Sequence, residues 1–103
     1  MTIFSKIIAG EISAPRIYED ELVIVIKDIA PEKKTHLLII PKKEIPTLND
    51  IDENDKELMS HMFYVAKKVA KDVGVEKAYR LRLNVGDLQD VMHIHMHLLS
   101  DLG

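Results

Sequence analysis

Three of the five histidines stand at every second position of one apolar segment, residues 93–97, which reads His-Ile-His-Met-His. In a β-strand, alternate residues point to the same face of the sheet and lie about 6–7 Å apart. A strand here would place His93, His95 and His97 in one row. The intervening side chains would then face a core, and these are Met92, Ile94, Met96 and Leu98. Imidazole can act as base, nucleophile or metal ligand near neutral pH, so the row predicts a functional site.

Three interpretations of this row are possible. The histidines could be polar residues without a function on a solvated sheet face, but three histidines at every second position favour a function. They could hold zinc, since catalytic zinc often has three histidine ligands. The outer members of a flat row lie about 13 Å apart at the backbone, which does not favour convergence on one ion. The third interpretation is metal-free phosphate chemistry, in which one imidazole attacks phosphorus and the others bind or protonate oxygens and the leaving group.

Composition narrows the class of protein. A chain of 103 residues suits one domain. The net charge of −3, without a long basic segment, argues against a nucleic-acid partner. The absence of cysteine excludes disulfides and thiolate metal sites, and makes a reducing cytoplasm the simplest setting. We expect neither a signal peptide nor a membrane span, because no apolar run approaches about 18 residues.

Hydrophobic spacing predicts the elements that position the row. Apolar residues three and four apart indicate a short helix from Ile3 to Ile8, ended by Gly10. Strands are expected at residues 15–19, 22–27 and 36–40, the last stopped by Pro41.

The second half of the chain predicts one long helix and a hairpin. The helix has Asp52 as its N-cap and ends at Gly74. Its apolar stripe consists of Leu58, Met62, Val65, Val69 and Val73. Residues 79–85 alternate and residues 91–99 carry the histidines, so these two segments predict an antiparallel hairpin. The pattern is α+β, with about five strands.

The segment from His93 to Leu99 resembles the His-φ-His-φ-His-φ-φ signature of the histidine triad (HIT) family, where φ is an apolar residue. Residues 3–8, 11–12, 18–20, 28–31, 35–41, 79–81 and 84–86 resemble the Hint branch of that family in the same order. The resemblance covers essentially the whole chain and is greatest to bacterial purine nucleoside phosphoramidases.

The resemblance implies a single HIT domain over residues 1–103, with the HIT-like fold: an antiparallel sheet of about five strands, one long helix and one short helix. It implies a cytoplasmic homodimer that binds a purine nucleotide such as AMP or GMP and needs no metal or cofactor. The implied activity is hydrolysis of the P–N bond of purine nucleoside 5′-phosphoramidates through a nucleotidyl-histidine intermediate. Two alternatives stay open: a dinucleoside polyphosphate hydrolase, and a catalytically weak nucleotide-binding or interaction module.

The resemblance also assigns roles to residues. His95 matches the attacking histidine, His97 the one that contacts phosphate and leaving group, and His93 the one that positions His95. His36 matches a further histidine of the site, and Asp28 the acid that binds the ribose hydroxyls. The apolar pocket around the base is matched by Ile3, Phe4, Ile7, Ile26 and Ile29. Residues near the phosphate are matched by Asn84, Gln89, Asp90 and Val91.

The chain departs from the family pattern in one loop. Relatives have a Gly-Gly pair before the first histidine, whereas residues 84–91 here read Asn-Val-Gly-Asp-Leu-Gln-Asp-Val, about two residues shorter. Asp90 stands where many relatives have serine, and a carboxylate there would repel a phosphate. Thr2 and Ser5 replace the cysteines that bind structural zinc in some members, so we expect that zinc to be absent.

One apolar surface of the predicted fold exceeds what a small domain can cover. The hairpin strand and the stripe of the long helix are therefore expected to contribute to a two-fold interface. The candidate interface residues are Met59, Met62, Val69, Leu81 and Leu83.

Overall fold

The computed structural model describes all residues, 1–103. It has two α-helices and five strands, joined by short 3-10 turns. The helices are α1 (Ile3–Ile8) and α2 (Lys56–Asp72), and the strands are β1 (Arg16–Glu19), β2 (Val23–Lys27), β3 (Thr35–Pro41), β4 (Arg80–Arg82) and β5 (Met96–Ser100). The predicted α+β class with five strands is confirmed.

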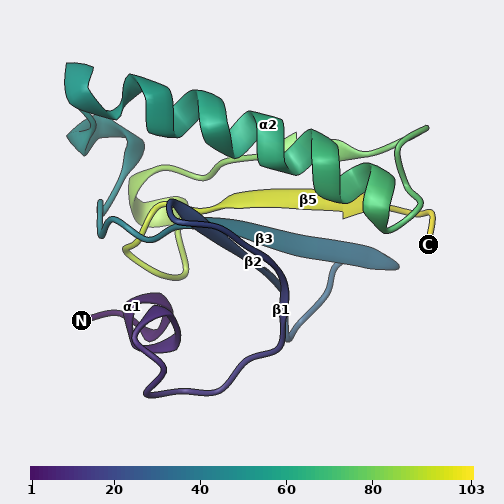
Figure 1. Cartoon of the computed structure of the whole chain (residues 1–103), viewed down its shortest axis with the longest axis horizontal. Helices are drawn as coiled ribbons and strands as arrows, with labels where there is room; N and C mark the ends of the chain where they lie inside the picture. Colours follow the sequence, from purple (N-terminus) through teal and green to yellow (C-terminus); the bar gives the residue numbers. More distant parts are fainter.

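The strands form one sheet in the order β1-β2-β3-β5-β4, and every neighbouring pair is antiparallel. Helix α2 crosses one face of this sheet, and α1 lies against the other (Figure 1). The two faces are therefore covered very unequally, by a helix of 17 residues and one of 6.

Local signals set the ends of the helices. The Thr2 side chain caps α1, and Gly10 follows with φ of 83°, a left-handed conformation that favours glycine. Asp52 is an N-cap as predicted, but of a 3-10 turn, Glu53–Asp55, that leads into α2 at Lys56. Gly74, with φ of 81°, ends α2.

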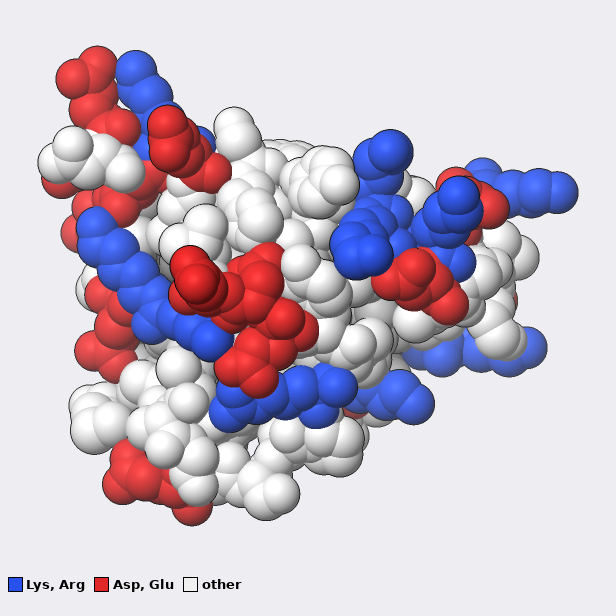
Figure 2. Space-filling view, in the orientation of Figure 1, with Lys and Arg blue, Asp and Glu red and all other residues white.

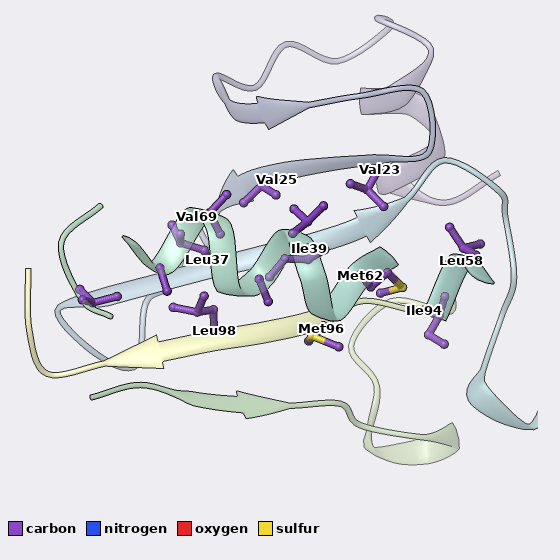
Figure 3. Close-up of a cluster of buried hydrophobic side chains, with 14 of the residues drawn as sticks. Val23, Val25, Leu37, Ile39, Leu58, Met62, Val69, Ile94, Met96 and Leu98 are labelled. Carbon is purple, nitrogen blue, oxygen red and sulfur yellow. The ribbon is translucent and has the colours of Figure 1, made fainter. Parts of the chain in front are cut away.

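The main core lies between α2 and the sheet (Figure 3). Met62, Val65 and Val69 of the predicted stripe have no exposed surface. Met62 and Val69 are thus wrong as candidates for an interface residue, because the chain's own sheet covers them. Met59, Leu81 and Leu83 are only partly buried, at the edge of this core.

A smaller apolar cluster lies under α1. Phe4 and Ile7 of the helix pack against alternate residues of two strands, and these are Ile24, Ile26, Leu38 and Ile40. Their neighbours along the same strands point to the α2 face, as the two-residue period requires. Both faces of the central strands are therefore apolar.

The two predicted hairpin strands are shorter than expected. Strand β4 spans three residues instead of 79–85, and β5 begins at Met96, so His93 and His95 precede it. Pairing of β3 with β5 stops at Ile39 opposite Met96. Pro41, farther along β3, has no N–H to offer a continuing ladder, and the Ile94 N–H donates instead to the carbonyl of Ile45. Met92 is exposed and does not face the core, unlike the other three apolar residues of this segment.

Acidic and basic side chains are separated along the length of α2. Acidic side chains gather around its start and lysines toward its end, where the chain turns back toward β4 (Figure 2). No helix has the length and apolar character that crossing a membrane would need.

Candidate active site

Four histidines meet on the α1 face of the sheet, and all are buried. His97 projects from β5, His36 from β3 and His95 from the segment before β5. The ring centroids of His95 and His97 lie 4.9 Å apart, and those of His36 and His97 lie 5.1 Å apart. The ring of Phe4, on α1, meets His95 edge-on at 5.0 Å. The structure thus brings the predicted catalytic histidines together beside α1.

His95 is held in one tautomer. Its Nδ1–H donates to the carbonyl of His93 at 2.8 Å, which leaves the lone pair on Nε2. No protein group bonds Nε2. Burial lowers the pKa of His95 below its usual value, so the ring is neutral at pH 7. A neutral imidazole with an oriented free nitrogen is a competent nucleophile.

The ring of His93 has no exposed surface, and protein groups occupy both of its nitrogens. Nε2–H donates to the carbonyl of Pro41 at 2.8 Å, and Nδ1 lies 3.3 Å from the hydroxyl of Thr2. The ring therefore ties the end of β3 to the start of α1. Its contact with His95 is made through its backbone carbonyl, which accepts from Nδ1–H of His95.

A hydrogen bond joins the rings of His36 and His97, and its donor and acceptor can be assigned. The backbone N–H of Glu32 donates to Nδ1 of His36 at 3.1 Å, so the His36 proton is on Nε2. That Nε2–H donates to Nδ1 of His97 at 2.8 Å, which puts the proton of His97 on its own Nε2. Nε2 of His97 is buried and has no partner. The chain of bonds therefore ends in a free N–H donor beside His95.

The electrostatics keep His97 neutral. Burial lowers its pKa to about 4, and the neighbouring His95 and Arg82 act in the same direction. At pH 7 the ring thus donates from Nε2 as a neutral group.

Asp28 lies at the rim of the histidine cluster. Its Oδ2 is 3.4 Å from Nε2 of His36, and its Oδ1 accepts from the N–H of Ala30. Donor atoms of Asp28, His36 and His97 lie within 4.8 Å of one another, a spacing that a metal ion could use. Metal binding would need the lone pair of His36 Nε2, but the Glu32 N–H puts a proton there. The donor set in this arrangement therefore does not fit a cation.

The predicted apolar pocket is only partly assembled. Phe4, Ile7 and Ile26 lie in the cluster under α1, next to the histidines. Ile3 is 46% exposed on the outer side of α1, and Ile29 is 96% exposed at the start of the loop after β2. The first three therefore form a fixed wall, whereas Ile29 makes little contact with the rest of the chain.

Comparison with known proteins identifies the family. The family model described as "Scavenger mRNA decapping enzyme C-term binding" matches residues 1–102. A purine nucleoside phosphoramidase from Escherichia coli K12 is 46% identical over 102 residues, covering 96% of this chain and 86% of that protein. The crystal structure of a HIT family hydrolase from Legionella pneumophila superposes with a TM-score of 0.95 at 43% identity, covering 100% of this chain and 95% of that one. The chain belongs to the histidine triad family of hydrolases.

Two further relatives agree. An uncharacterized HIT-like protein from Synechocystis is 44% identical, covering 96% of this chain and 89% of that protein. A HIT family hydrolase from Clostridium thermocellum has a TM-score of 0.92 at 44% identity, covering 99% of this chain and 93% of that one.

The short loop of this HIT protein, residues 84–91, is stabilised by hydrogen bonds of its own Gln89 side chain. Its 3-10 turn, Gly86–Leu88, begins at a glycine with φ of 71°. The Gln89 side chain accepts from the Gly86 N–H and donates to the carbonyls of Pro46 and Val91. Gln89 therefore shapes the loop, because both N–H donors of its amide are already bonded and none is left for a phosphate. Val91 packs against the cluster under α1.

Asn84 and Asp90 stand at the two ends of this loop. Asn84 is half-buried, and Asp90 is exposed with no side-chain hydrogen bond. Asp90 nevertheless lies close enough to act on the site, because its charge favours the protonated form of His95 and so opposes the lowering of that pKa.

Two residues that contact the histidines, Arg82 and Glu32, were not identified from the sequence. Arg82 pairs with His97 across β4 and β5 and so shares its face. The guanidinium donates to both carboxylate oxygens of Glu32, at 3.1 and 2.5 Å, and the Glu32 N–H orients His36. The alternation of residues 79–85 already put Arg82 on the polar side of its strand, and the hairpin register would have placed it beside His97.

Proposed function

We propose that the protein hydrolyses the P–N bond of purine nucleoside 5′-phosphoramidates. The observation that carries this proposal is the pairing of a free Nε2 on His95 with an unpartnered Nε2–H on His97. One group can attack phosphorus, and the other can donate a hydrogen bond to the phosphoryl oxygens where negative charge develops. The 46% identical relative named purine nucleoside phosphoramidase supports the choice of substrate.

The reaction then has two steps. Nε2 of His95 attacks the α-phosphorus, and the P–N bond breaks with its electron pair going to nitrogen. The leaving nitrogen takes up a proton from solvent as the bond breaks, and Nε2–H of the neutral His97 donates a hydrogen bond to a phosphoryl oxygen, so an amine departs and a nucleotidyl-His95 forms. Water next attacks the phosphorus, loses a proton to solvent, and frees His95 and the nucleoside monophosphate. The His93 carbonyl holds Nδ1–H of His95 and stabilises the positive charge of the nucleotidyl imidazole.

The nucleoside is proposed to bind on the α1 side of the histidines. Phe4, Ile7 and Ile26 would face the base, and Asp28 would accept from the ribose 2′- and 3′-hydroxyls. Asn84 would donate to the phosphate. A purine offers the larger apolar face to such a wall.

The assay compares two substrates. Release of AMP from adenosine 5′-phosphoramidate and from a diadenosine polyphosphate is measured side by side, with and without chelator. Preferred hydrolysis of the phosphoramidate, unchanged by the chelator, is expected. Preferred hydrolysis of the polyphosphate would select the alternative hydrolase, and AMP binding without turnover would select a binding module.

Mass spectrometry of quenched enzyme is expected to find the nucleotide on His95, and an adduct on another residue would overturn the assignment of His95 as the nucleophile.

We also propose that residues 1–103 act as one HIT domain, in the cytoplasm, as a homodimer. Strand β4 is an edge of the sheet with an unpaired side. The flank of α2 opposite His61 carries Met59 and Phe63, and Phe63 is 58% exposed. His61 is bonded to Asp20 before β2, so this other flank lies toward β4. Sedimentation is expected to show a dimer that Phe63→Glu dissociates, and an active wild-type monomer at micromolar concentration would contradict it.

A further inference from the structure

A cavity of about 470 Å³ lies between β4, the end of β5 and the loop before β3. In the β4–β5 register Arg80 is opposite Leu99 and Arg82 is opposite His97, so both arginines and Leu99 project from the histidine face. Leu99, Arg80 and Arg82 line the cavity. The loop before β3 and the chain's end contribute Glu32, Lys33 and Asp101. No histidine lines the cavity, and Arg82 and Leu99, the neighbours of His97 on its own face, connect it with the histidines.

The lining of this cavity has an excess of positive charge. Arg82 is paired with Glu32, and Lys33 lies 3.4 Å from a carboxylate oxygen of Asp101. Arg80 is exposed and has no carboxylate within ion-pair distance. Nε of Arg82 is buried and has no hydrogen-bond partner. One whole cation and one buried N–H donor are thus unsatisfied by the protein itself.

Strand order indicates which part of a substrate reaches this cavity. The base wall and Asp28 belong to the β2 and β3 side of the histidines, and His97 stands on β5. Strand β4 lies on the opposite side of β5 from the nucleoside. Neighbouring strands are about 4.8 Å apart, so a group about 5 Å beyond the scissile nitrogen would lie over β4.

We infer that this cavity binds an acidic leaving group, so that the preferred substrates are phosphoramidates whose amine carries a carboxylate or phosphate. This inference rests on the proposed function and adds the chemical class of the departing amine. Arg80 is the main recognition residue, and Arg82 contributes its Nε–H. Dimer formation through the β4 edge extends the sheet sideways and leaves this face of β4 open.

The test uses adenosine 5′-phosphoramidates that differ only in the amine. β-Alanine supplies a carboxylate at the right reach, O-phosphoethanolamine supplies a phosphate, and β-alaninamide is the neutral match of the first. The ratio of kcat/KM for each acidic substrate to that for the amide cancels any general change in activity. With one or two cations at a partly exposed site, we expect a ratio of about three to ten, falling at high salt.

Variants at Arg80 assign this ratio to the cavity. The side chain is exposed and unpaired, so replacement leaves the fold intact. Arg80→Gln is expected to bring the ratio close to one, and Arg80→Lys to retain part of it. Lys67→Gln, a matched loss of charge on the exposed surface of α2, is expected to leave the ratio unchanged.

Each outcome decides one point. A ratio of one in the wild type, or a raised ratio that Arg80→Gln does not alter, overturns the acidic subsite while the proposed function stands. A preference for only one acidic substrate identifies the anion as carboxylate or phosphate and supports the subsite. No hydrolysis of the unsubstituted phosphoramidate or of any conjugate overturns the proposed function, and the subsite with it.

Discussion

The two faces of the sheet divide stability from chemistry. The α2 face contributes to a cluster of 15 buried apolar residues that includes no charged or histidine side chain. The α1 face has an apolar cluster of only 6 residues, and beside it stand the buried histidines with their directed hydrogen bonds. Burying polar groups costs free energy unless each finds a partner, and Nε2 of His97 has none. The large apolar face stabilises a fold in which the other face can hold reactive groups.

The sharpest separation of the two faces comes from His95→Ala. Loss of the nucleophile is expected to lower turnover of adenosine 5′-phosphoramidate by about 10³-fold or more. AMP binding should change little, because the apolar wall under α1 and Asp28 stay in place, whereas the melting temperature should fall, because the buried ring packs against Phe4 and bonds the His93 carbonyl. His61→Ala, on α2, is the matched control and should keep turnover within about twofold. Comparable losses in both variants would contradict the assignment of the chemistry to the α1 face.

The reverse effect is expected from Met62→Ala on the other face. Met62 has no exposed surface, and truncating a buried methionine to alanine lowers the free energy of unfolding by about 2–5 kcal/mol. Denaturant titration measures this loss. At low temperature, where the variant is folded, kcat on the phosphoramidate should stay near the wild-type value. A well-folded variant with a strongly reduced kcat would show that packing under α2 controls the histidine geometry.

Sequence periodicity predicted the α2 face better than the site. Apolar spacing identifies Met62 and Val69 as one stripe, and glycine identifies the end of the helix, because both signals are local. The row of histidines was correctly placed on one face, but the strand predicted for residues 91–99 begins only at Met96. What ends that strand is remote in sequence: the His93 ring bonds Pro41, and Ile94 bonds Ile45. The tautomer of His36 depends likewise on a loop amide that no residue pattern reveals.

A third expectation concerns acid stability and the α1 face alone. His97 has a pKa of about 4 in the folded protein, against about 6.5 when unfolded. Between these values the unfolded chain binds more protons, so the free energy of unfolding falls as pH falls. From pH 7 to pH 5 this single group accounts for about 2 kcal/mol. Denaturant titrations at both pH values should show a smaller drop for His97→Asn than for the wild type, and equal drops would contradict the burial of a neutral His97.

The smallest expected effect tests the short loop at the edge of the α1 face. Asp90 is exposed, yet its charge reaches His95, so an ionised Asp90 should oppose a bound phosphate by about 1 kcal/mol or less. Asp90→Ser is then expected to tighten AMP binding by about two- to fivefold and to raise kcat/KM on the phosphoramidate. The gain should shrink at high salt, because screening weakens exposed charge pairs. Asp87→Ser, in the same loop and also exposed, is the matched control.

Slower turnover in Asp90→Ser would mean that the carboxylate bonds a site histidine or the leaving amine. If affinity and rate both stayed unchanged, the shortened loop would carry Asp90 away from the phosphate, and its position in the site would be wrong.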